Sequence, residues 1–311
     1  MNVLLVTKSD DNESIDFVTR ALKKRGARAV RLDTDTYPLE VKLSTTVGGP
    51  RVLDTGRARV DLETLGAIWY RRFAAGEGLP SLLGDTLDAS IQESRRTLYG
   101  SIAATPCFQL DPLASVRLAD HKELQLRRAA AFGLDVPRTL FSNDPKAVRA
   151  FARACGDKVI TKMQGQFSIW REGLEQVVYT TALEEPGELD GLEYCPMTFQ
   201  ELVPRRVELR ATVVGKRVLT ASVESPRVDW RRDGIALLEQ WQPYTLPPRV
   251  EKALLKLTRS FGLNYAAADF IVTPDGRHVF LEINAGGEFF WLERKPGLPI
   301  AAAIAEVLTK R

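Results

Sequence analysis

The alternation of apolar and polar residues in the first third of the chain predicts an α/β unit. Residues 3–6 form an apolar run typical of a buried strand, and residues 12–25 have the spacing of an amphipathic helix that ends at Gly26. Residues 28–32 form a second strand, so the chain opens as a strand, a helix and a strand, the pattern of an α/β fold. Further strands and one long helix are predicted at residues 41–46, 51–53, 67–70 and 82–104.

The pattern becomes more helical after residue 110 and richer in strands near the end. Asp111 followed by Pro112 is typical of a helix start, with Asp111 as N-cap and the proline at the first helical position. Two helices are expected to run from there to Phe132. The elements predicted beyond them are a strand near residue 136, a helix at 145–155, a strand at 158–163, strands from 198 onward, and helices at 248–261 and 298–308.

Composition excludes several classes of protein. The chain has 311 residues, of which 44% are apolar and 27% charged, which indicates a globular protein of about two domains at roughly 150 residues each. Two histidines and three cysteines without CxxC spacing disfavour zinc sites, iron-sulfur clusters and a disulfide framework. We found no secretory signal pattern at the start and no apolar stretch of the ~20 residues that a membrane span needs. A soluble, cytoplasmic protein is therefore expected.

The charge distribution is more informative than the total. The net charge of +3 is too small for a dedicated nucleic-acid binder. Paired arginines nevertheless recur, and pairs on predicted helices are best interpreted as solvated surface. Those beside strands or loops could instead bind phosphate or carboxylate, which arginine holds in bidentate fashion. They are Arg71-Arg72, Arg205-Arg206 and Arg231-Arg232.

Residues 264–293 carry the clearest chemical pattern. Two apolar runs flank Asp275-Gly276, the pair favoured in a two-residue type I′ hairpin turn. With that turn, Asp269 lies directly opposite Glu282, and Asn284 shares their face because side chains alternate along a strand. Two opposed carboxylates repel by a few tenths to ~1 kcal/mol. We therefore expect a cation beside them.

The three oxygen-bearing side chains predict a magnesium site. Carboxylate and amide oxygens suit a hard ion such as Mg²⁺, which usually takes further ligands from the phosphates of a nucleotide. The alternative is a hairpin whose acids simply face water. Both strands are rich in apolar residues, which predicts burial and argues against that alternative.

The common nucleotide-binding loops are missing from the sequence. Neither GxxxxGK[ST] nor GxGxxG occurs, so the phosphates would need other cations. Lys122 opens a predicted helix, and Lys162 ends an apolar strand, which makes it the better candidate. Each lysine alone is more often a surface charge.

An extended run that ends at Pro204 predicts a place for adenine, held by backbone groups between apolar residues. The four residues of this linker are Gln200, Glu201, Leu202 and Val203. Glu208 and Arg210 then share one face of the next strand. An acid can bind a ribose hydroxyl, and an arginine can stabilise the charge of a transferring phosphoryl group. A cross-strand ion pair remains an open alternative for these residues.

In chain order these residues resemble the ATP-grasp ligase superfamily over residues 111–293. More specific blocks resemble the graspetide synthetases, the peptide macrocyclases of the microviridin type. These blocks are Trp69-Tyr70-Arg71-Arg72, the run from Cys195 to Glu201, Asp229-Trp230-Arg231 and the run from Gly287 to Glu293. The resemblance implies an ATP-grasp fold of mixed helices and sheets, α/β (α+β), in three parts. They are a Rossmann-like α/β lobe at 1–110, a small central α+β lobe at 111–204, and an antiparallel-sheet lobe with the magnesium hairpin at 205–311.

The resemblance also implies roles for individual residues. Lys122 and Lys162 would contact the phosphates of ATP, Glu201 and Val203 would hold adenine, and Glu208 would bind ribose. The remaining roles are Arg210 and Arg231 at the phosphate and acyl group, and Asp269, Glu282 and Asn284 on Mg²⁺. The sequence departs from the family pattern in two places, a loop at 163–166 without several glycines and Ala285 where proline is expected.

The implied activity is ATP-dependent macrocyclisation of a ribosomal precursor peptide. A side-chain carboxylate of the peptide would become an acyl phosphate, and a Thr or Ser hydroxyl would displace phosphate to close an ω-ester ring. Glu288 is a candidate base for that hydroxyl, with a capping or structural role as the alternative. A leader segment of the precursor could dock on an acidic stretch, which as an alternative is only a solvated loop. Its residues are Glu184, Glu185, Glu188, Asp190 and Glu193.

Other functions stay open at this point. Related enzymes form amides, either as a Lys-to-carboxylate macrolactam or by RimK-like addition of amino acids to a peptide. A non-enzymatic alternative is a regulatory nucleotide-binding or nucleic-acid-binding module that uses the arginine pairs, although the metal triad argues against it. The family resemblance further implies a homodimer that binds neither nucleic acid nor membrane.

Overall fold

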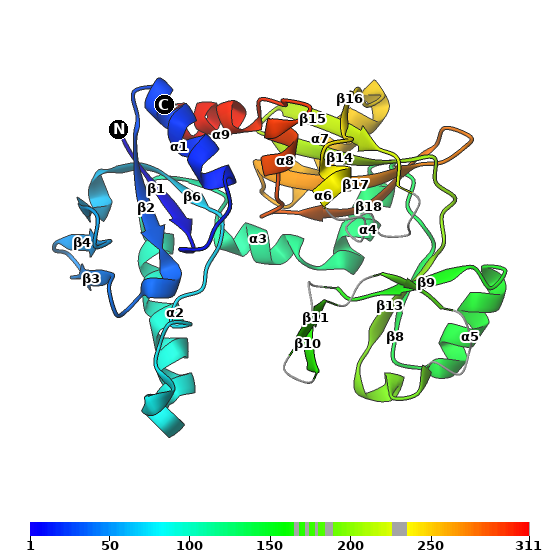
Figure 1. Ribbon diagram of the computed structural model, residues 1–311, viewed down its shortest axis with the longest axis horizontal. Helices are drawn as coiled ribbons and strands as arrows, with labels where there is room; N and C mark the ends of the chain where they lie inside the picture. The colour runs from blue at the N-terminus through cyan, green and yellow to red at the C-terminus, as the bar shows by residue number, and fades with distance from the viewer. Residues whose placement is uncertain (165–167, 172–173, 178–179, 184–188, 226–234, 311) are drawn as a thin grey trace.

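The N-terminal part is built on a parallel sheet. A computed structural model describes residues 1–164, 168–171, 174–177, 180–183, 189–225 and 235–310 (Figure 1). The sheet has the order β2-β1-β6-β7. Its strands are β1 (Asn2–Thr7), β2 (Arg28–Asp33), β6 (Leu65–Tyr70) and β7 (Phe108–Leu110), with helix α1 (Ser14–Lys24) between the first two. The predicted strand, helix and strand at the start of the chain are confirmed.

Both faces of this sheet are buried, which explains the unbroken apolar run of β1. Val3 and Leu5 face a core that contains α1 and the C-terminal helix α9 (Ile300–Thr309). Leu4 and Val6 face the opposite way, into a second core. The last helix of the chain therefore packs against its first sheet.

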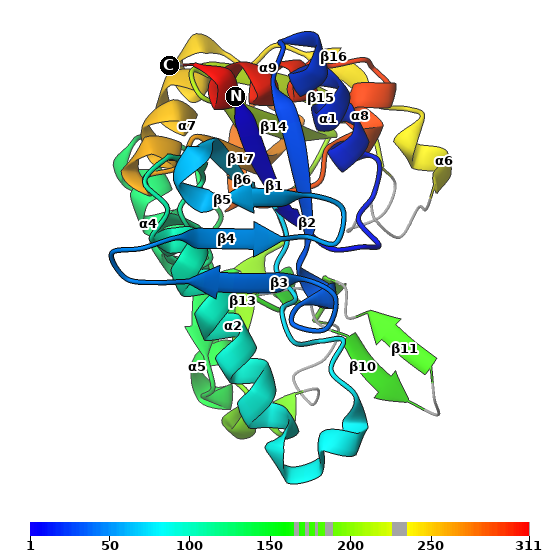
Figure 2. The ribbon, with the colours of Figure 1, turned by 90° about the vertical axis from the view of Figure 1, so that its left-hand side faces the viewer.

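The second core lies under a small antiparallel sheet and a long helix (Figure 2). The sheet consists of β3 (Lys42–Thr45), β4 (Arg51–Asp54) and β5 (Arg59–Asp61), and the helix is α2 (Leu87–Ala103). The single helix predicted at 82–104 is wrong at its start. Gly84 adopts φ 53° and interrupts the helical path within the short 3-10 segment η3 (Ser81–Thr86), which precedes α2.

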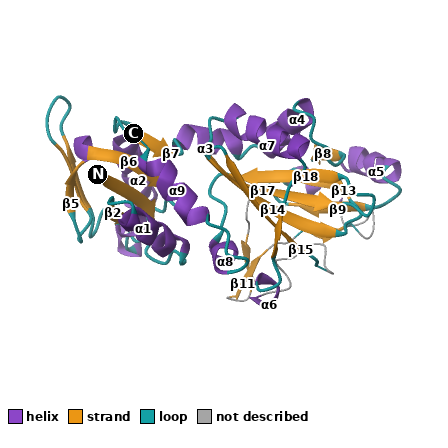
Figure 3. Cartoon of the chain, turned by 90° about the horizontal axis from the view of Figure 1, so that it is seen from above, coloured by secondary structure: helices purple, strands orange, loops and turns teal. Residues whose placement is uncertain are grey.

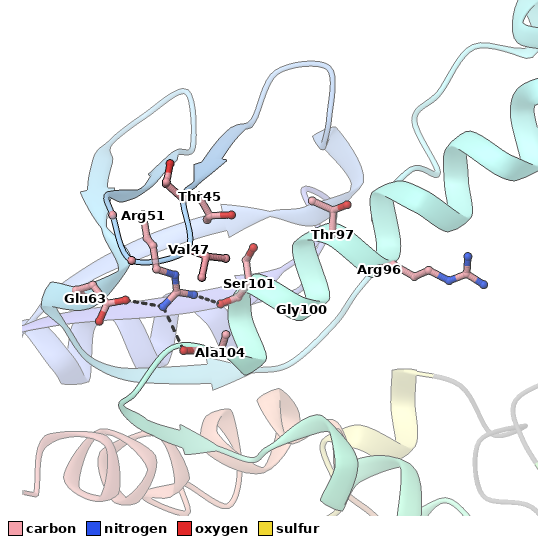
Figure 4. A pocket seen from close by; sticks show the side chains of 12 residues that line it. Thr45, Val47, Arg51, Glu63, Arg96, Thr97, Gly100, Ser101 and Ala104 are labelled. Carbon is pink, nitrogen blue, oxygen red and sulfur yellow. Dashed lines mark hydrogen bonds and ion pairs between the residues drawn. The ribbon is translucent and has the colours of Figure 1, made fainter.

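Arg51 connects the small sheet to the C-terminal end of α2 by hydrogen bonds. Its guanidinium donates to the carbonyls of Ser101 at 2.7 Å and Ala104 at 3.1 Å, and it pairs with Glu63 Oε1 at 2.6 Å (Figure 4). A positive group is favourable at a helix C-terminus, where carbonyls lack partners. A surface hollow of about 690 Å³ lies beside this contact, between α2 and the turn after β3.

The central part is a four-stranded sheet of order β12-β9-β13-β8 with one helix. Its elements are β8 (Thr139–Ser142), α5 (Pro145–Ala154), β9 (Val159–Lys162), β12 (Thr181–Ala182) and β13 (Met197–Glu201), and β10 (Ser168–Arg171) and β11 (Leu174–Val177) form a separate hairpin. The predicted start of α5 is confirmed, because the Asp144 carboxylate accepts from the Lys146 N–H at 2.8 Å.

The C-terminal part is a five-stranded antiparallel sheet of order β16-β15-β14-β17-β18. Its strands are β14 (Val207–Val214), β15 (Arg217–Val223), β16 (Gln242–Tyr244), β17 (Tyr265–Val272) and β18 (His278–Asn284). Helices α4 (Lys122–Ala131) and α7 (Pro248–Ser260) pack on one face. The remaining short elements are α3 (Leu113–Ala119), α6 (Ile235–Leu238), α8 (Phe290–Arg294), η1 (Thr34–Thr36), η2 (Leu62–Thr64) and η5 (Leu192–Tyr194).

Two helices connect the N-terminal and C-terminal sheets, which lie side by side along the molecule (Figure 3). Helix α3 runs between them, and α9 contacts both β6 and β14. Among the described residues no sheet crosses the predicted divisions at 110/111 and 204/205, which stay predictions as domain boundaries. No helix in the described part of the chain has the length and apolar composition that a membrane span requires.

Asp111 joins these two sheets instead of capping a helix. The N-cap position of α3 is Pro112, so the predicted capping role of Asp111 is wrong. Its buried carboxylate accepts from the N–H groups of Asn264 at 2.9 Å and Tyr265 at 2.8 Å, and from the Asn264 amide at 3.0 Å. Burial outweighs these hydrogen bonds and raises the pKa of Asp111 to about 6. The residue that the sequence pattern predicts as an N-cap thus makes a tertiary contact with β17 instead.

We expect Asp111→Ala to lower the free energy of unfolding by roughly 1–3 kcal/mol, because buried donors lose their acceptor. The pKa of Asp111 is higher in the folded than in the unfolded chain, so its stabilising contribution is complete at low pH and declines as pH rises through about 6. The difference between wild type and variant, measured by denaturant titration, should therefore be larger near pH 4.5 than near pH 7.5. A difference that grows with pH would contradict the raised pKa.

Candidate functional site

The turn of the β17–β18 hairpin differs from the prediction. Thr273 N donates to Arg277 O at 3.0 Å, so three residues rather than two form the loop. Gly276 has φ 88°, the left-handed position that closes such a three-residue loop. The predicted two-residue type I′ turn is therefore wrong.

The predicted pairing of the two acids is nevertheless confirmed. Asp269 lies opposite Glu282, whereas the next residue, Phe270, lies opposite Phe280. A β-bulge at this step leaves Leu281 without an opposite residue. The extra residue in the bulge compensates for the extra residue in the loop, so the carboxylates meet although the turn was misassigned.

Helix α4 is held on the edge of β18 by one side chain. The buried Gln125 amide accepts from Ile283 N at 2.9 Å and donates to Ile283 O at 2.9 Å, as a neighbouring strand would. Lys122 lies one helical turn earlier on the same face of α4. Its Nζ is 3.1 Å from Glu282 Oε2 and 3.2 Å from Asn284 Oδ1. The packing of α4 against β18 thus places the Lys122 ammonium group beside two of the three predicted metal ligands.

The third predicted ligand is paired with a second cation. Arg210 on β14 lies opposite Asp269 on β17, and its Nη1 is 2.7 Å from each carboxylate oxygen. The guanidinium lies 5.6 Å from the ring centroid of Trp291. The cation expected beside the two acids is therefore present twice, as Arg210 and Lys122. Arg210 thus makes the cross-strand ion pair that was the alternative interpretation of this strand, whereas Glu208 accepts from Arg205 Nη1 at 2.9 Å.

Glu282 is held in its ionised form. Burial alone would raise its pKa, but the charges of Lys122 and Lys162 and the Asn284 amide, which donates to Glu282 Oε1 at 3.0 Å, lower the pKa below its ordinary value. Lys162 comes from β9 of the central sheet. The carboxylate therefore senses cations from two separate parts of the chain, as a phosphate-binding site between lobes requires.

The donor set fits a magnesium nucleotide. In the described part of the chain no three His, Cys, Asp or Glu side chains are grouped to hold a metal, so the side-chain donors at this hairpin are two carboxylates and the amide oxygen of Asn284. Mg²⁺ commonly binds one or two carboxylates and takes its other ligands from phosphates and water. The buried Nε of Arg210 has no hydrogen-bond partner among the described residues, which suits an incoming phosphate oxygen.

The predicted adenine linker offers backbone rather than side chains. Glu201 N donates to Arg138 O at 3.0 Å, and Leu202 N donates to Lys158 O at 2.8 Å. The Glu201 carboxylate pairs with Arg138 Nε at 2.7 Å. The Val203 N–H, in contrast, makes no backbone hydrogen bond within the described residues. Val203 is thus the linker residue best suited to an adenine nitrogen, while the Gln200 amide is used internally by donating to Thr139 at 2.9 Å.

A hollow of about 330 Å³ opens at the beginning of α4, beside Lys122. Its lining comes from α4 and from the central part of the chain, and consists of His121, Lys122, Glu123, Leu124, Arg127, Phe141 and Gln164. Lys122 therefore borders both the metal ligands and an accessible space.

Some predicted residues cannot be placed. Arg231 lies outside the described residues, as do Glu184, Glu185 and Glu188 of the acidic stretch. Asp190 and Glu193 are described and exposed, and a role for them in leader binding stays a prediction.

Known proteins match this chain over nearly its whole length. Residues 2–117 match the MvdD pre-ATP grasp domain family. The macrocyclase MdnC of Microcystis aeruginosa MRC, solved with precursor peptide MdnA, is 45% identical with a TM-score of 0.91 over 99% of both chains. The RiPP-associated ATP-grasp ligase of Chryseobacterium gregarium, solved with ADP and a leader and core peptide, is 37% identical with a TM-score of 0.93 over 99% of this chain and 96% of that one.

The chain belongs to the ATP-grasp peptide macrocyclases. A third relative, macrocyclase MdnB of Microcystis aeruginosa MRC, is 35% identical with a TM-score of 0.82 over 100% of this chain and 99% of that one. No curated protein matches. The predicted family, the ATP-grasp fold of mixed helices and sheets, and the class of ATP-dependent ligase are confirmed. The roles of individual site residues rest on the geometry above and stay predictions.

A second charged cluster in this macrocyclase was not predicted. Arg71 Nε is 2.6 Å from Asp11 Oδ2, and Arg71 Nη2 is 2.7 Å from Glu288 Oε2. Arg72 contacts both carboxylates as well. Burial would raise the pKa of Asp11, but the hydrogen bond and charge of Arg71 lower it. The signal in the sequence was the arginine pair directly after β6, which binds carboxylates of the protein itself.

Glu288 therefore has a structural role. Its carboxylate is bound by two guanidinium groups and by the Asn12 amide, which leaves it poorly suited to accept a proton from a substrate hydroxyl. It does not cap α8 either, because Phe289 occupies the N-cap position. The interpretation of Glu288 as a base is not supported, whereas the structural alternative fits.

A two-glycine turn links Asn284 to Glu288. A Cβ on Gly287 would lie 2.3 Å from the Cβ of Ala267, the residue opposite Asn284. A Cβ on Gly286 would lie 3.4 Å from Arg71 O, an ordinary contact. Only the second glycine is thus required by close packing against the metal hairpin.

We expect Gly287→Ala to shift Asn284, because the added methyl group overlaps Ala267. Overpacking of this kind costs about 1–3 kcal/mol of stability. A shift of about 1 Å in a catalytic group can lower turnover ~100-fold. Thermal unfolding and ATP turnover should show both effects, and the control Gly286→Ala should resemble wild type. Equal turnover of the two variants would contradict this account of the turn.

Proposed function

We propose that the protein uses Mg²⁺ and ATP to activate side-chain carboxylates of a ribosomal precursor peptide and joins them to Thr or Ser hydroxyls as ω-esters. The observation that carries this proposal is the cross-strand row in which Arg210 and Lys122 flank Asp269 and Glu282. The complexes of MdnC with its precursor peptide and of the Chryseobacterium gregarium ligase with ADP and a leader and core peptide support the choice of substrates.

The chemistry follows from the weakness of a carboxylate as an electrophile. A carboxylate oxygen of the peptide attacks the terminal phosphorus of ATP, and ADP leaves. The hydroxyl oxygen of Thr or Ser then attacks the acyl carbon, phosphate leaves, and the hydroxyl proton is lost to solvent or a base. Mg²⁺, when bound, neutralises phosphate charge and holds the phosphates in line for transfer.

The residues of the chain orient the reactants. Lys122 and Lys162 approach the acidic hairpin from two directions, which supports a role for both in binding the phosphates. Arg210 is nearly buried, at 8% exposure, where its charge is only weakly screened by water. It is therefore suited to stabilise the charge that passes between phosphoryl and acyl oxygens. The backbone N–H of Val203 is the candidate for adenine, and Glu208, although paired with Arg205, remains the candidate for ribose.

The amide-forming alternatives use the same activation and differ only in the nucleophile. A Lys-to-carboxylate macrolactam or RimK-like amino-acid addition would need an amine where the ester needs a hydroxyl. The level of identity to MdnC and MdnB favours ring closure. A cytoplasmic location, a homodimer and a leader-docking surface in the central part complete the proposal.

Incubation of candidate precursor peptides, rich in Thr and acidic residues, with the protein and Mg-ATP should yield a product that has lost one water per ring. Mass spectrometry makes this measurement, and amino-acid addition would instead increase the mass. Hydroxylamine should cleave the new bonds, because esters are labile to it and amides are not. A resistant ring would favour the macrolactam alternative.

Asp269→Ala and Glu282→Ala should each lower peptide-dependent ADP release by about 100-fold or more, since a charge-stabilising contact is lost. Circular dichroism should show that both variants fold, and Asp269→Ala should be the less stable of the two because the nearly buried Arg210 loses its partner. Glu123→Gln is the matched control, an acid near the beginning of α4 that pairs on the surface with Arg127. Normal ADP release from either alanine variant would overturn the metal assignment.

A further inference from the structure

Each side chain of the proposed metal site is already contacted by a cation of the protein. Asp269 is held by Arg210 through both oxygens at 2.7 Å, and Glu282 and Asn284 are held by Lys122 at 3.1 and 3.2 Å. Two carboxylates face two cations, so the formal charges of these four ionised groups cancel. Lys162 adds a further positive charge near Glu282, so cations of the protein already balance the carboxylates.

A metal ion without nucleotide cannot easily displace Arg210 and Lys122 from these side chains. The side chains of Arg210 and Lys122 are only 9% and 12% exposed, so water replaces their partners poorly. A metal ion that takes Asp269 leaves the Arg210 charge in a nearly buried position, and breaking a buried ion pair in this way is strongly unfavourable. The Nε of Arg210 already has no partner among the described residues.

A metal ion that arrives with phosphates meets a different situation. The phosphate oxygens provide new anions for the two displaced cations. Lys122 borders the hollow of about 330 Å³ at the start of α4 and has space into which it can turn. Arg210 can keep its position 5.6 Å from the Trp291 ring centroid while its unpartnered Nε donates to a phosphate oxygen.

We propose that Arg210 and Lys122 are exchangeable counter-ions, which block the metal ligands until nucleotide phosphates release them. This inference rests on the proposed function only in taking Mg²⁺ and ATP as ligands. If so, each ligand increases the affinity of the protein for the other, and the metal ligands become free to bind the ion only when nucleotide is also bound. By linkage, the factor by which nucleotide tightens metal binding equals the factor by which metal tightens nucleotide binding.

Arg205 provides a matched control. It lies near the same strand and pairs with Glu208 at 2.9 Å, as Arg210 pairs with Asp269. Glu208 is not one of the proposed metal ligands, so loss of Arg205 removes an equal charge without freeing a ligand. The comparison separates the exchange of counter-ions from a general effect of net charge.

The test is the affinity of the full chain for Mn²⁺ with and without ADP, read from the electron paramagnetic resonance signal of the free ion after subtraction of the Mn²⁺ that the same ADP binds without protein. Wild type should bind Mn²⁺ alone weakly and about 10-fold or more tightly with ADP, within the usual range of coupling between sites. Arg210→Gln and Lys122→Met should bind Mn²⁺ alone about 5-fold to 30-fold more tightly than wild type, and ADP should then tighten Mn²⁺ binding by a correspondingly smaller factor. Arg205→Gln should bind Mn²⁺ alone as wild type does.

Two outcomes would overturn the inference. One is wild-type binding of Mn²⁺ that ADP leaves unchanged, a result that needs no variant to fold. The other is Mn²⁺ affinity of folded Arg210→Gln and Lys122→Met no higher than that of Arg205→Gln. Failure of the proposed function is read separately, from the mass of the precursor peptide, so the two failures are distinguishable.

Discussion

The proximity of two carboxylates on adjacent strands is the constraint on which the site depends. Asp269 and Glu282 face each other in the β17–β18 ladder, where like charges repel. The fold meets this constraint from two sides, with Arg210 on the neighbouring strand and Lys122 on a helix laid across the edge. Each needs a long-range contact, because β14 precedes β17 by some fifty residues and α4 is more distant still. The two carboxylates and their two cations thus come from segments that lie far apart in the chain.

The same site shows why sequence reasoning succeeded in part. Alternation along strands was enough to put Asp269, Glu282 and Asn284 on one face, since that period is a property of the backbone. The loop length and the bulge at Leu281 were not readable, because Asp-Gly suits more than one turn and a bulge depends on neighbouring packing. The pairing was right only because these two features compensate.

Tertiary contacts account for most of what the sequence did not predict. Asp111 has the pattern of an N-cap, yet the backbone of β17 competes successfully for its carboxylate. Gln125 belongs to no sequence motif. It is important because its amide hydrogen-bonds the edge strand β18 at Ile283, 158 positions later in the sequence. Local propensity identifies an element and its face. It does not identify which distant polar group will meet a given side chain.

The protein uses arginine and carboxylate pairs in two ways that exposure distinguishes. Arg71 and Asp11 have side chains 2% and 0% exposed, so their pairing is sealed and no ligand can replace it. Asp269 and Glu282 are 23% and 28% exposed, and a ligand with its own anions can reach them. Arg71 of this sealed pair also contacts the partly exposed Glu288, four residues after Asn284, and so links the N-terminal sheet to the turn after the hairpin. A fixed set of ion pairs therefore positions the hairpin on which an exchangeable set can operate.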